Sequence, residues 1–197
     1  MLRRRAFLRA MGGIGVVVSG IRGTNKATGK GRSKPAQMGE QMVQFSTPAF
    51  EDGNRIPQEF TCEGQNISPP LDIESVPDEV NSLAIIVDDP DAPSGTFTHW
   101  AIWDIPPDTK RIPRGVPGME IVADLGGAKH GENDAGELGY LGPCPPMGDS
   151  SHTYRFTLYL LERQPRLGAG ATKSALLDAM GGIRLGQTRF TGEFERG

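Results

Sequence analysis

The chain has 197 residues, a length that a single domain with its own hydrophobic core accounts for. Its 27 glycines and 16 prolines show no fixed period, which excludes a collagen-like chain and favours a fold with many turns. Residues 1–39 carry nine Lys or Arg and no acidic residue, whereas residues 40–197 carry 12 basic and 24 acidic residues, a net charge of −12. This acidic body argues against nucleic acid or an anionic membrane as the main partner.

The N-terminus is predicted to be an export signal. Arg3, Arg4 and Arg5 are followed by Ala-Phe-Leu-Arg and then by a short apolar stretch from Ala10 to Ile21 that four glycines dilute. Paired arginines, a nearby Phe-Leu and weak hydrophobicity resemble a twin-arginine export signal. About 12 residues are too few for a membrane-spanning helix, which needs roughly 20. Residues 1–22 are therefore predicted to be a twin-arginine-like signal segment; the alternative is a basic tail without a targeting role.

Residues 23–41 follow as a predicted flexible linker, because they are rich in Gly, Lys, Thr and Ser and offer no core of their own. Residues 42–197 then form the folded domain. The export signal predicts an extracytoplasmic protein. Because no clear cleavage motif follows the leader, the protein is expected to be either secreted or tethered to the membrane by an uncleaved leader.

Five strands and one helix are predicted in the folded domain. Runs of alternating or continuous apolar residues recur between Gly and Pro turns. The helix has Thr172 as its N-cap, packs Ala175, Leu176 and Ala179 against the core, and stops at Gly181. Several strands with few helices indicate an antiparallel sheet architecture. The strands are predicted over Met42–Phe45, Ser82–Val87, Phe97–Ile105, Tyr154–Leu161 and Thr188–Phe194, and the helix over Thr172–Met180.

Polar side chains lie where three apolar strand faces end. Side chains alternate along a strand, so Asp89 continues the face of Leu83, Ile85 and Val87 as a carboxylate. It opens the segment Asp89-Pro90-Asp91-Ala92-Pro93, a loop that two prolines stiffen. An Asp-Pro pair alone is a common turn opener, so this loop becomes informative only together with other features.

Two of the three histidines occupy similar positions at strand ends. By strict alternation, His99 shares a face with Phe97, Ala101 and Trp103. A lone histidine is more often a satisfied core or surface residue than a ligand-binding one. The third, His130, is expected in a Gly-rich loop. His152 shares its predicted face with Tyr154, Phe156, Leu158 and Leu160.

Motifs along the chain resemble the phosphatidylethanolamine-binding proteins, and specifically their prokaryotic, Raf-kinase-inhibitor-like branch. The resemblance covers about 150 residues, from Phe45 to Arg196. It rests on Phe60-Thr61-Cys62-Glu63-Gly64 with Asn66-Ile67-Ser68-Pro69-Pro70-Leu71, Asp89-Pro90-Asp91-Ala92-Pro93, His99-Trp100, Gly139-Tyr140-Leu141-Gly142-Pro143-Cys144-Pro145-Pro146 and His152-Thr153-Tyr154-Arg155-Phe156, in the family order.

The resemblance implies a mainly β fold, an antiparallel β-sandwich with one or two short helices, and a rigid pocket for phosphate-like or carboxylate anions. The chain departs from the family at Leu71-Asp72-Ile73, which lacks the usual tryptophan, and at Glu193-Phe194, where Thr-Tyr is more usual. Carried over by position, the ligand-binding residues are Asp89, Asp91, Pro93, His99, Gly142, Cys144, Pro145, His152 and Tyr154.

Imidazole can supply the positive charge that such an anion needs near neutral pH. Asp89 beside His99 or His152 is expected to raise the pKa of that histidine by favouring its cation. The imidazolium would then give a charge-assisted hydrogen bond to the ligand, and Tyr154 a second hydrogen bond. Only Cys144 keeps a backbone N–H within the Pro-rich turn from Pro143 to Pro146, which suits a preshaped wall.

We therefore predict a non-enzymatic, anion-binding protein without cofactor or metal. His99, His152 and Asp89 lack a short metal-ligand spacing. One alternative is an inhibitor of a protease or kinase that acts through its surface, a role described for family members. A second is a small hydrolase, although no nucleophile elbow surrounds Ser150, Ser151 or Cys144.

The sequence also bears on the binding partners and on whether the two cysteines form a disulfide. The expected ligand is a small anion or a phospholipid head group, a protease or kinase is the candidate protein partner, and a homodimer is left open. Cys62 and Cys144 lie in two of the motifs, and export would place them in an oxidising compartment. A disulfide and two buried thiols are both compatible with the sequence, which does not fix their separation.

Overall fold

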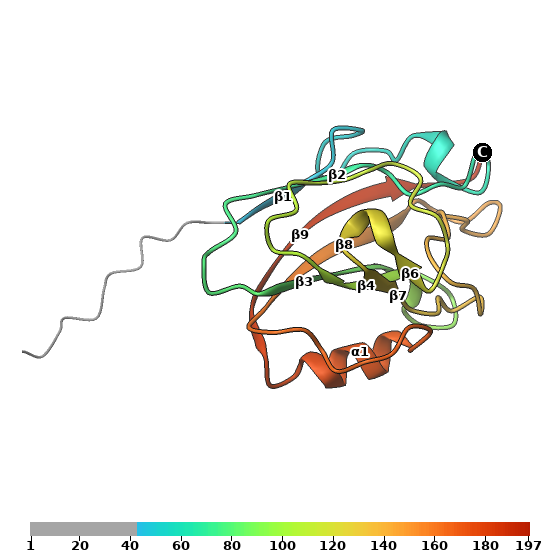
Figure 1. Ribbon diagram of the computed structural model, residues 1–197. Helices are drawn as coiled ribbons and strands as arrows, with labels where there is room; N and C mark the ends of the chain where they lie inside the picture. Colours follow the sequence, from blue (N-terminus) through green and yellow to red (C-terminus); the bar gives the residue numbers. More distant parts are fainter. Residues whose placement is uncertain (1–42) are drawn as a thin grey trace, which may run out of the picture. The chain divides into compact units, whose positions relative to one another are not determined.

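The computed structural model describes residues 43–197, so the predicted signal (1–22) and linker (23–41) lie outside its described part. Two antiparallel sheets make up most of the fold (Figure 1). The six-stranded sheet has the order β6 (Ile121–Val122), β7 (Ala128–His130), β4 (Phe97–Ile105), β3 (Ser82–Asp89), β8 (His152–Leu161) and β9 (Arg184–Phe194). The three-stranded sheet has the order β1 (Gln44–Ser46), β2 (Leu71–Glu74) and β5 (Arg111–Ile112).

The remaining elements are short. Two 3-10 turns, η1 (Gln58–Phe60) and η2 (Ala123–Leu125), and one helix, α1 (Lys173–Met180), complete the described chain. The predicted mainly β, antiparallel architecture is therefore confirmed.

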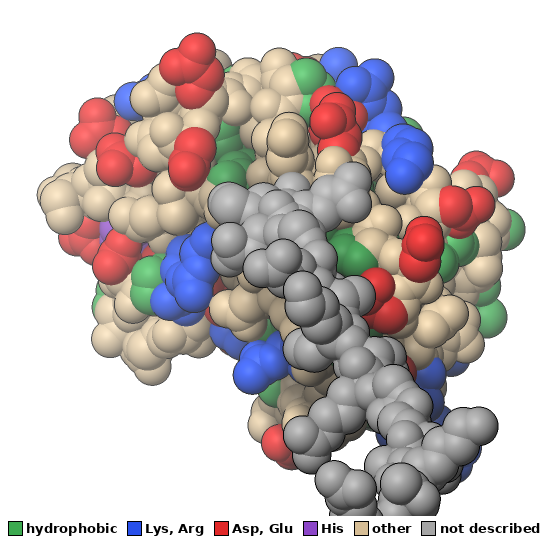
Figure 2. Space-filling model, turned by 90° about the vertical axis from the view of Figure 1, so that its left-hand side faces the viewer, with side chains coloured by type: hydrophobic (Ala, Val, Ile, Leu, Met, Phe, Trp, Pro, Cys, Tyr) green, Lys and Arg blue, Asp and Glu red, His purple; other side chains and the backbone are tan. Residues whose placement is uncertain are grey.

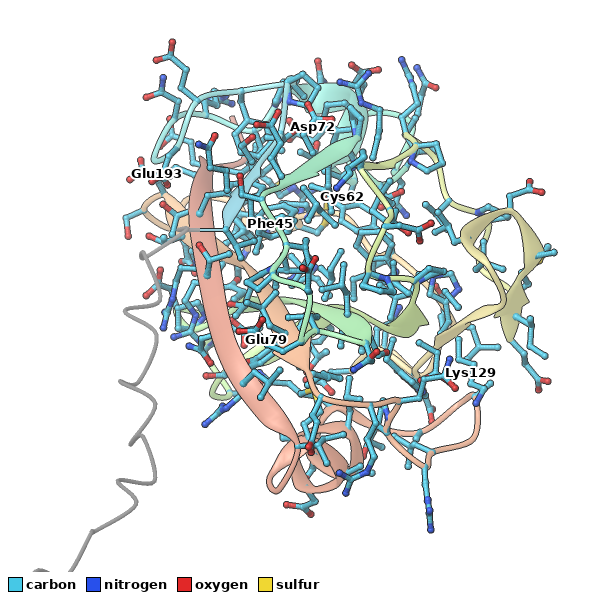
Figure 3. All side chains as sticks on the ribbon, turned by 60° about the vertical axis from the view of Figure 1, so that its left-hand side comes forward. Phe45, Cys62, Asp72, Glu79, Lys129 and Glu193 are labelled. Carbon is cyan, nitrogen blue, oxygen red and sulfur yellow. A yellow bond between two sulfur atoms is a disulfide. The ribbon has the colours of Figure 1, made fainter. Side chains whose placement is uncertain are left out.

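Both faces of the large sheet are buried. Leu83, Ile85 and Val87 of β3 point into the core between the two sheets, while Ala84 and Ile86 point to the other side, as period-two alternation requires. Figure 1 shows α1 beneath the large sheet, on the side away from β1 and β2. Figure 3 shows side chains filling the space between the sheets, with the core residue Phe45 on β1. β3 therefore contributes side chains to both hydrophobic cores.

The helix follows the predicted start and stop. Thr172 caps α1, because its side-chain oxygen accepts the Ala175 N–H at 3.4 Å. The side chains that α1 buries are Leu176 and Met180, whereas Ala175 and Ala179 are only half-buried. The predicted packing face was therefore right at Leu176 and missed Met180.

The five predicted strands were found, with boundaries that differ by up to four residues. β4 matches, β3 and β8 match to within two residues, and β9 begins four residues before its predicted start. β1 covers Gln44–Ser46, where a strand was predicted over Met42–Phe45. β2, β5, β6 and β7 were not predicted, because two to four residues are too few to show a periodic pattern. His130, which was expected in a loop, is the last residue of β7. Where the surface is visible in Figure 2, acidic side chains lie scattered with basic ones among them, so the acidic excess forms no single patch there.

Candidate functional site

A small cavity lies at one end of the large sheet. Its volume of about 230 Å³ lies below the roughly 300–1,000 Å³ of pockets for drug-sized ligands, so it suits a small group. The ends of β3, β4 and β8 supply its polar side chains, and two loops supply the remaining wall. It is lined by Asp89, Ala92, Pro93, Ser94, Phe97, His99, Leu141, Cys144, Pro145, Pro146, His152 and Tyr154.

A buried carboxylate and a buried imidazole meet in this cavity. Asp89 is 3% exposed and His152 is 4% exposed, and Oδ2 of Asp89 lies 2.8 Å from Nδ1 of His152. The other carboxylate oxygen accepts the backbone N–H of Asp91 at 2.8 Å. Alternation along β3 and β8 predicted both orientations. Because both oxygens of Asp89 are engaged, its role is to orient His152, whose Nε2 is left for the cavity or for Asp149, 3.8 Å away.

His99 reaches the same cavity through a β-bulge. Val87 pairs with Trp100 and the next residue, Asp88, pairs with Thr98, so His99 is an extra residue in β4. Its ring centroid lies 5.1 Å from that of Tyr154. The prediction that His99 shares a face with Ala101 and Trp103 was therefore wrong, because those two side chains pack on the helix side of the sheet. The bulge re-aims His99 toward the cavity.

The environment of His99 also differs from the prediction. Its Nδ1 lies 2.8 Å from the carbonyl oxygen of Leu141, so the Nδ1–H donates to that carbonyl. Burial lowers the pKa of His99 below its ordinary value of 6.5, although the Leu141 hydrogen bond and the nearby carboxylates, Asp89 first, act in the opposite direction. Of the two histidines that were expected beside Asp89, His152 contacts the carboxylate, and burial governs the pKa of His99.

Tyr154 closes the inner side of the cavity. Its side chain is fully buried, and its hydroxyl makes no hydrogen bond to another residue of the described chain. Burial first, and then the charge of Asp89, raises the pKa of this hydroxyl above its ordinary range. Tyr154 therefore stays protonated, and its O–H remains a hydrogen-bond donor.

The Pro-rich wall is fixed to a second loop. A disulfide joins Cys62 to Cys144, with the Cα atoms 5.4 Å apart, and the Cys62 N–H donates to the Pro143 carbonyl at 3.1 Å. The hydroxyl of Tyr140 donates to the Phe60 carbonyl at 2.9 Å. These bonds hold the wall in place without a ligand.

Two of the predicted residues do not line the cavity. Gly142 packs against the second loop: its N–H donates to Oδ1 of Asn66 at 2.6 Å, and a Cβ there would lie 2.5 Å from the Phe60 carbonyl oxygen. The carboxylate of Asp91 accepts the Thr153 N–H at 2.8 Å and so ties its loop to β8. Both residues shape the loops rather than face the cavity.

Four lining residues were not predicted, whereas Pro146 belongs to the predicted Pro-rich turn. Each of the four lies near a predicted residue, in the loop after Asp89, at the start of β4 or just before the turn, so membership of these segments was the available signal. They are Ala92, Ser94, Phe97 and Leu141.

Two other classes of site find no support in the described residues. Between residues 43 and 197 no three His, Cys, Asp or Glu side chains are placed as ligands of a metal ion. Over the same residues no helix has the length and apolar character needed to cross a membrane.

The chain matches known proteins over the whole described fold. Residues 46–195 match the family model described as phosphatidylethanolamine-binding protein. The chain belongs to the phosphatidylethanolamine-binding protein family. This confirms the resemblance that the motifs indicated. A Methanothermobacter thermautotrophicus protein named UPF0098 protein is 48% identical over 155 residues, which are 79% of this chain and 100% of the relative.

Two further relatives place the chain within the prokaryotic part of this phosphatidylethanolamine-binding protein family. The crystal structure of Escherichia coli YbcL, described as a member of the mammalian family, has a TM-score of 0.72 at 28% identity and covers 79% of this chain and 99% of its own. A Mycobacterium tuberculosis protein, LppC, that is named as a lipoprotein is 39% identical over 173 residues, 86% of this chain and 80% of its own length.

Proposed function

We propose that the chain is a non-enzymatic binding protein that holds a small anionic group, a phosphate or a carboxylate, in the cavity at the end of its large sheet. One observation carries this proposal: three buried polar side chains, Asp89, His99 and His152, converge on a cavity whose wall is fixed by a disulfide. The family's name supports a phospholipid head group as the source of the anion.

The cavity is better equipped for binding than for hydrolysis. The Asp89–His152 pair is the arrangement that activates a nucleophile, but no hydroxyl or thiol of the described residues lies within hydrogen-bond distance of His152 Nε2. Cys144, the one cysteine at the cavity, has its sulfur in the disulfide with Cys62. The pair therefore orients an imidazole toward a ligand.

Calorimetric titration with glycerophosphoethanolamine, dimethyl phosphate and acetate tests the proposal and separates head group, simple phosphate diester and carboxylate. His99→Gln should weaken binding about 10- to 100-fold, the equivalent of about 1.5–3 kcal/mol for a charge-assisted hydrogen bond. Glu162→Gln is the matched control, because Glu162 lies beyond the opposite end of β8 in an exposed pair with Arg163. Equal loss in both variants would place the ligand elsewhere.

Incubation with esterase and phosphatase substrates tests the non-enzymatic part of the proposal. We expect no product above the buffer rate. Turnover that disappears in His152→Gln would make the protein a hydrolase.

We also propose that residues 1–22 direct export, supported by the paired arginines and by a relative named as a lipoprotein. Replacing Arg4 and Arg5 with Lys should keep the protein in the cytoplasm. Unchanged export of this variant would refute the assignment.

A further inference from the structure

The two cavity histidines each use one ring nitrogen on the protein itself. Nδ1 of His99 donates to the Leu141 carbonyl and Nδ1 of His152 donates to Asp89, both at 2.8 Å. Each neutral ring therefore carries its hydrogen on Nδ1 and presents a lone pair at Nε2. An anion also presents lone pairs, so it gains no hydrogen bond from a neutral histidine here.

No permanently charged cation of the described cavity lining replaces the hydrogen bond that a neutral histidine cannot donate. The lining in the described chain contains no Lys or Arg, and its one charged residue other than histidine is the carboxylate Asp89. An anion can therefore be held by a histidine only if that histidine gains a proton at Nε2.

The two histidines differ in the counter-ions that the protein provides. His152 has a carboxylate at each ring nitrogen, Asp89 at 2.8 Å and Asp149 at 3.8 Å, so a positive charge on it is neutralised within the protein with or without a ligand. His99 forms no ion pair: its polar contact is the neutral Leu141 carbonyl, and its ring neighbours are Phe97 and Tyr154, at 4.9 and 5.1 Å.

Other charged groups influence His99 only from beyond ion-pair distance. They are Asp88 and Asp89 of β3 and Asp134, whose side chain accepts the Thr98 N–H. Burial outweighs their influence and lowers the pKa of His99, so the ring is neutral near pH 7 without a ligand. A cation at His99 thus needs a counter-ion from outside the protein.

We propose that the cavity takes up one proton together with its anionic ligand and that Nε2 of His99 holds this proton. The inference rests on the proposed function, because it describes how the same cavity accepts its anion. A proton from solvent adds to the lone pair of Nε2, and the new N–H donates to a ligand oxygen. A singly charged oxyanion, such as a phosphodiester or a carboxylate, then lies in the cavity with its charge matched.

A definite pH dependence follows from this coupling. The anion raises the pKa of His99, so affinity increases as pH falls through the pKa of the complex. It levels off below the lower pKa of the ligand-free protein, where His99 is already charged.

Proton NMR of the full chain tests the proposal, because the chain has only three histidines. Their ring signals are followed from about pH 5 to 8 without ligand, with dimethyl phosphate, and with trimethyl phosphate, its uncharged analogue. His99→Gln and His152→Gln assign the signals. His130 is the internal control, because its ring is fully buried and its Nδ1 donates to the Met119 carbonyl, away from the cavity lining.

Saturating dimethyl phosphate should raise the titration midpoint of His99 by about one pH unit or more, which corresponds to about tenfold tighter binding to the protonated protein. The His130 midpoint should not move, and trimethyl phosphate should change neither. A rise with acetate in place of dimethyl phosphate would assign the cavity to carboxylates and still support proton uptake. Bound probe with an unchanged His99 midpoint, or a rise at His152 alone, would overturn the inference. No response of any signal to either anion would overturn the proposed function as well.

Discussion

Asp88 and Asp89 are consecutive residues of β3 that point to opposite sides of the large sheet, and they have different kinds of partner. Asp88 faces the helix side, where Arg155 Nε lies at 2.7 Å and Lys173 Nζ, at the start of α1, at 2.5 Å. Asp89 faces the cavity side, where its partner is the titratable ring of His152. Asp88 forms ion pairs with two permanently charged side chains, so its role is structural. Asp89 has a titratable partner beside the cavity, so it belongs to the candidate binding site.

The cavity side should depend most strongly on its disulfide. Replacing both Cys62 and Cys144 with Ser removes a link between residues 82 positions apart and should lower the free energy of unfolding by about 2–5 kcal/mol. Anion affinity should fall too, because Cys144 is part of the cavity wall. Denaturant unfolding of the oxidised chain and of the double variant measures the loss.

Reduction of the wild-type chain is the control for this prediction, since it removes the same link without changing the side-chain volume. Equal stability of the oxidised and reduced chains would mean that the hydrogen bonds between the two loops suffice.

The helix side should respond in stability but not in binding. Asp88→Asn leaves Arg155 and Lys173 without a countercharge and should cost about 1–3 kcal/mol, at the lower end because both cations are partly exposed. Anion affinity should stay within about twofold. Asp89→Asn should do the opposite, weakening binding with a smaller loss of stability.

Unfolding and titration of the two Asn variants in parallel give the comparison. If Asp88→Asn abolished binding while the protein remained folded, the two sides of the sheet would not be independent.

Stability should fall in mild acid, because burial is the main cause of the lowered pKa of both His99 and His130. The unfolded chain binds protons more readily at these two positions, so their contribution is complete above about pH 6.5 and is lost progressively as pH falls toward the folded-state pKa values. The slope approaches at most about 1.4 kcal/mol per pH unit for each histidine.

Urea unfolding at several pH values between about 5 and 8 measures this slope. His99→Gln should reduce it by the share of one histidine. A slope of the opposite sign, with stability rising in acid, would contradict the lowered pKa values.

The sequence predicted the fold and half of the site's geometry for a clear reason. Asp89 and His152 lie on strands whose side chains alternate without interruption near the cavity, so a period of two was sufficient. His99 was misplaced because a single extra residue in β4 reverses the alternation, and nothing in the local sequence marks a bulge there.

Contacts between distant segments were beyond the same reasoning. The disulfide joins residues 82 positions apart, and whether two such cysteines meet depends on the tertiary fold. Gly142 shares a motif with the cavity residue Cys144, but its role is to let two loops approach closely. Motif membership locates a segment at a site without showing which of its residues face the ligand.

Substitution of Asp91 tests whether a residue of a site motif faces the ligand, and it has the smallest expected effect. Its side chain accepts one exposed hydrogen bond, from the Thr153 N–H, whereas its contribution to Asp89 comes from its backbone N–H. Asp91→Ala keeps that backbone N–H and should cost about 0.5–1.5 kcal/mol of stability, the net value of one hydrogen bond. Because the cavity lining does not include Asp91, anion affinity should change by less than about twofold. Titration of Asp91→Ala beside Asp89→Asn decides the matter: a comparable loss of affinity in both would mean that the loop carboxylate reaches the ligand after all, and that the cavity is larger in the complex than in the free protein.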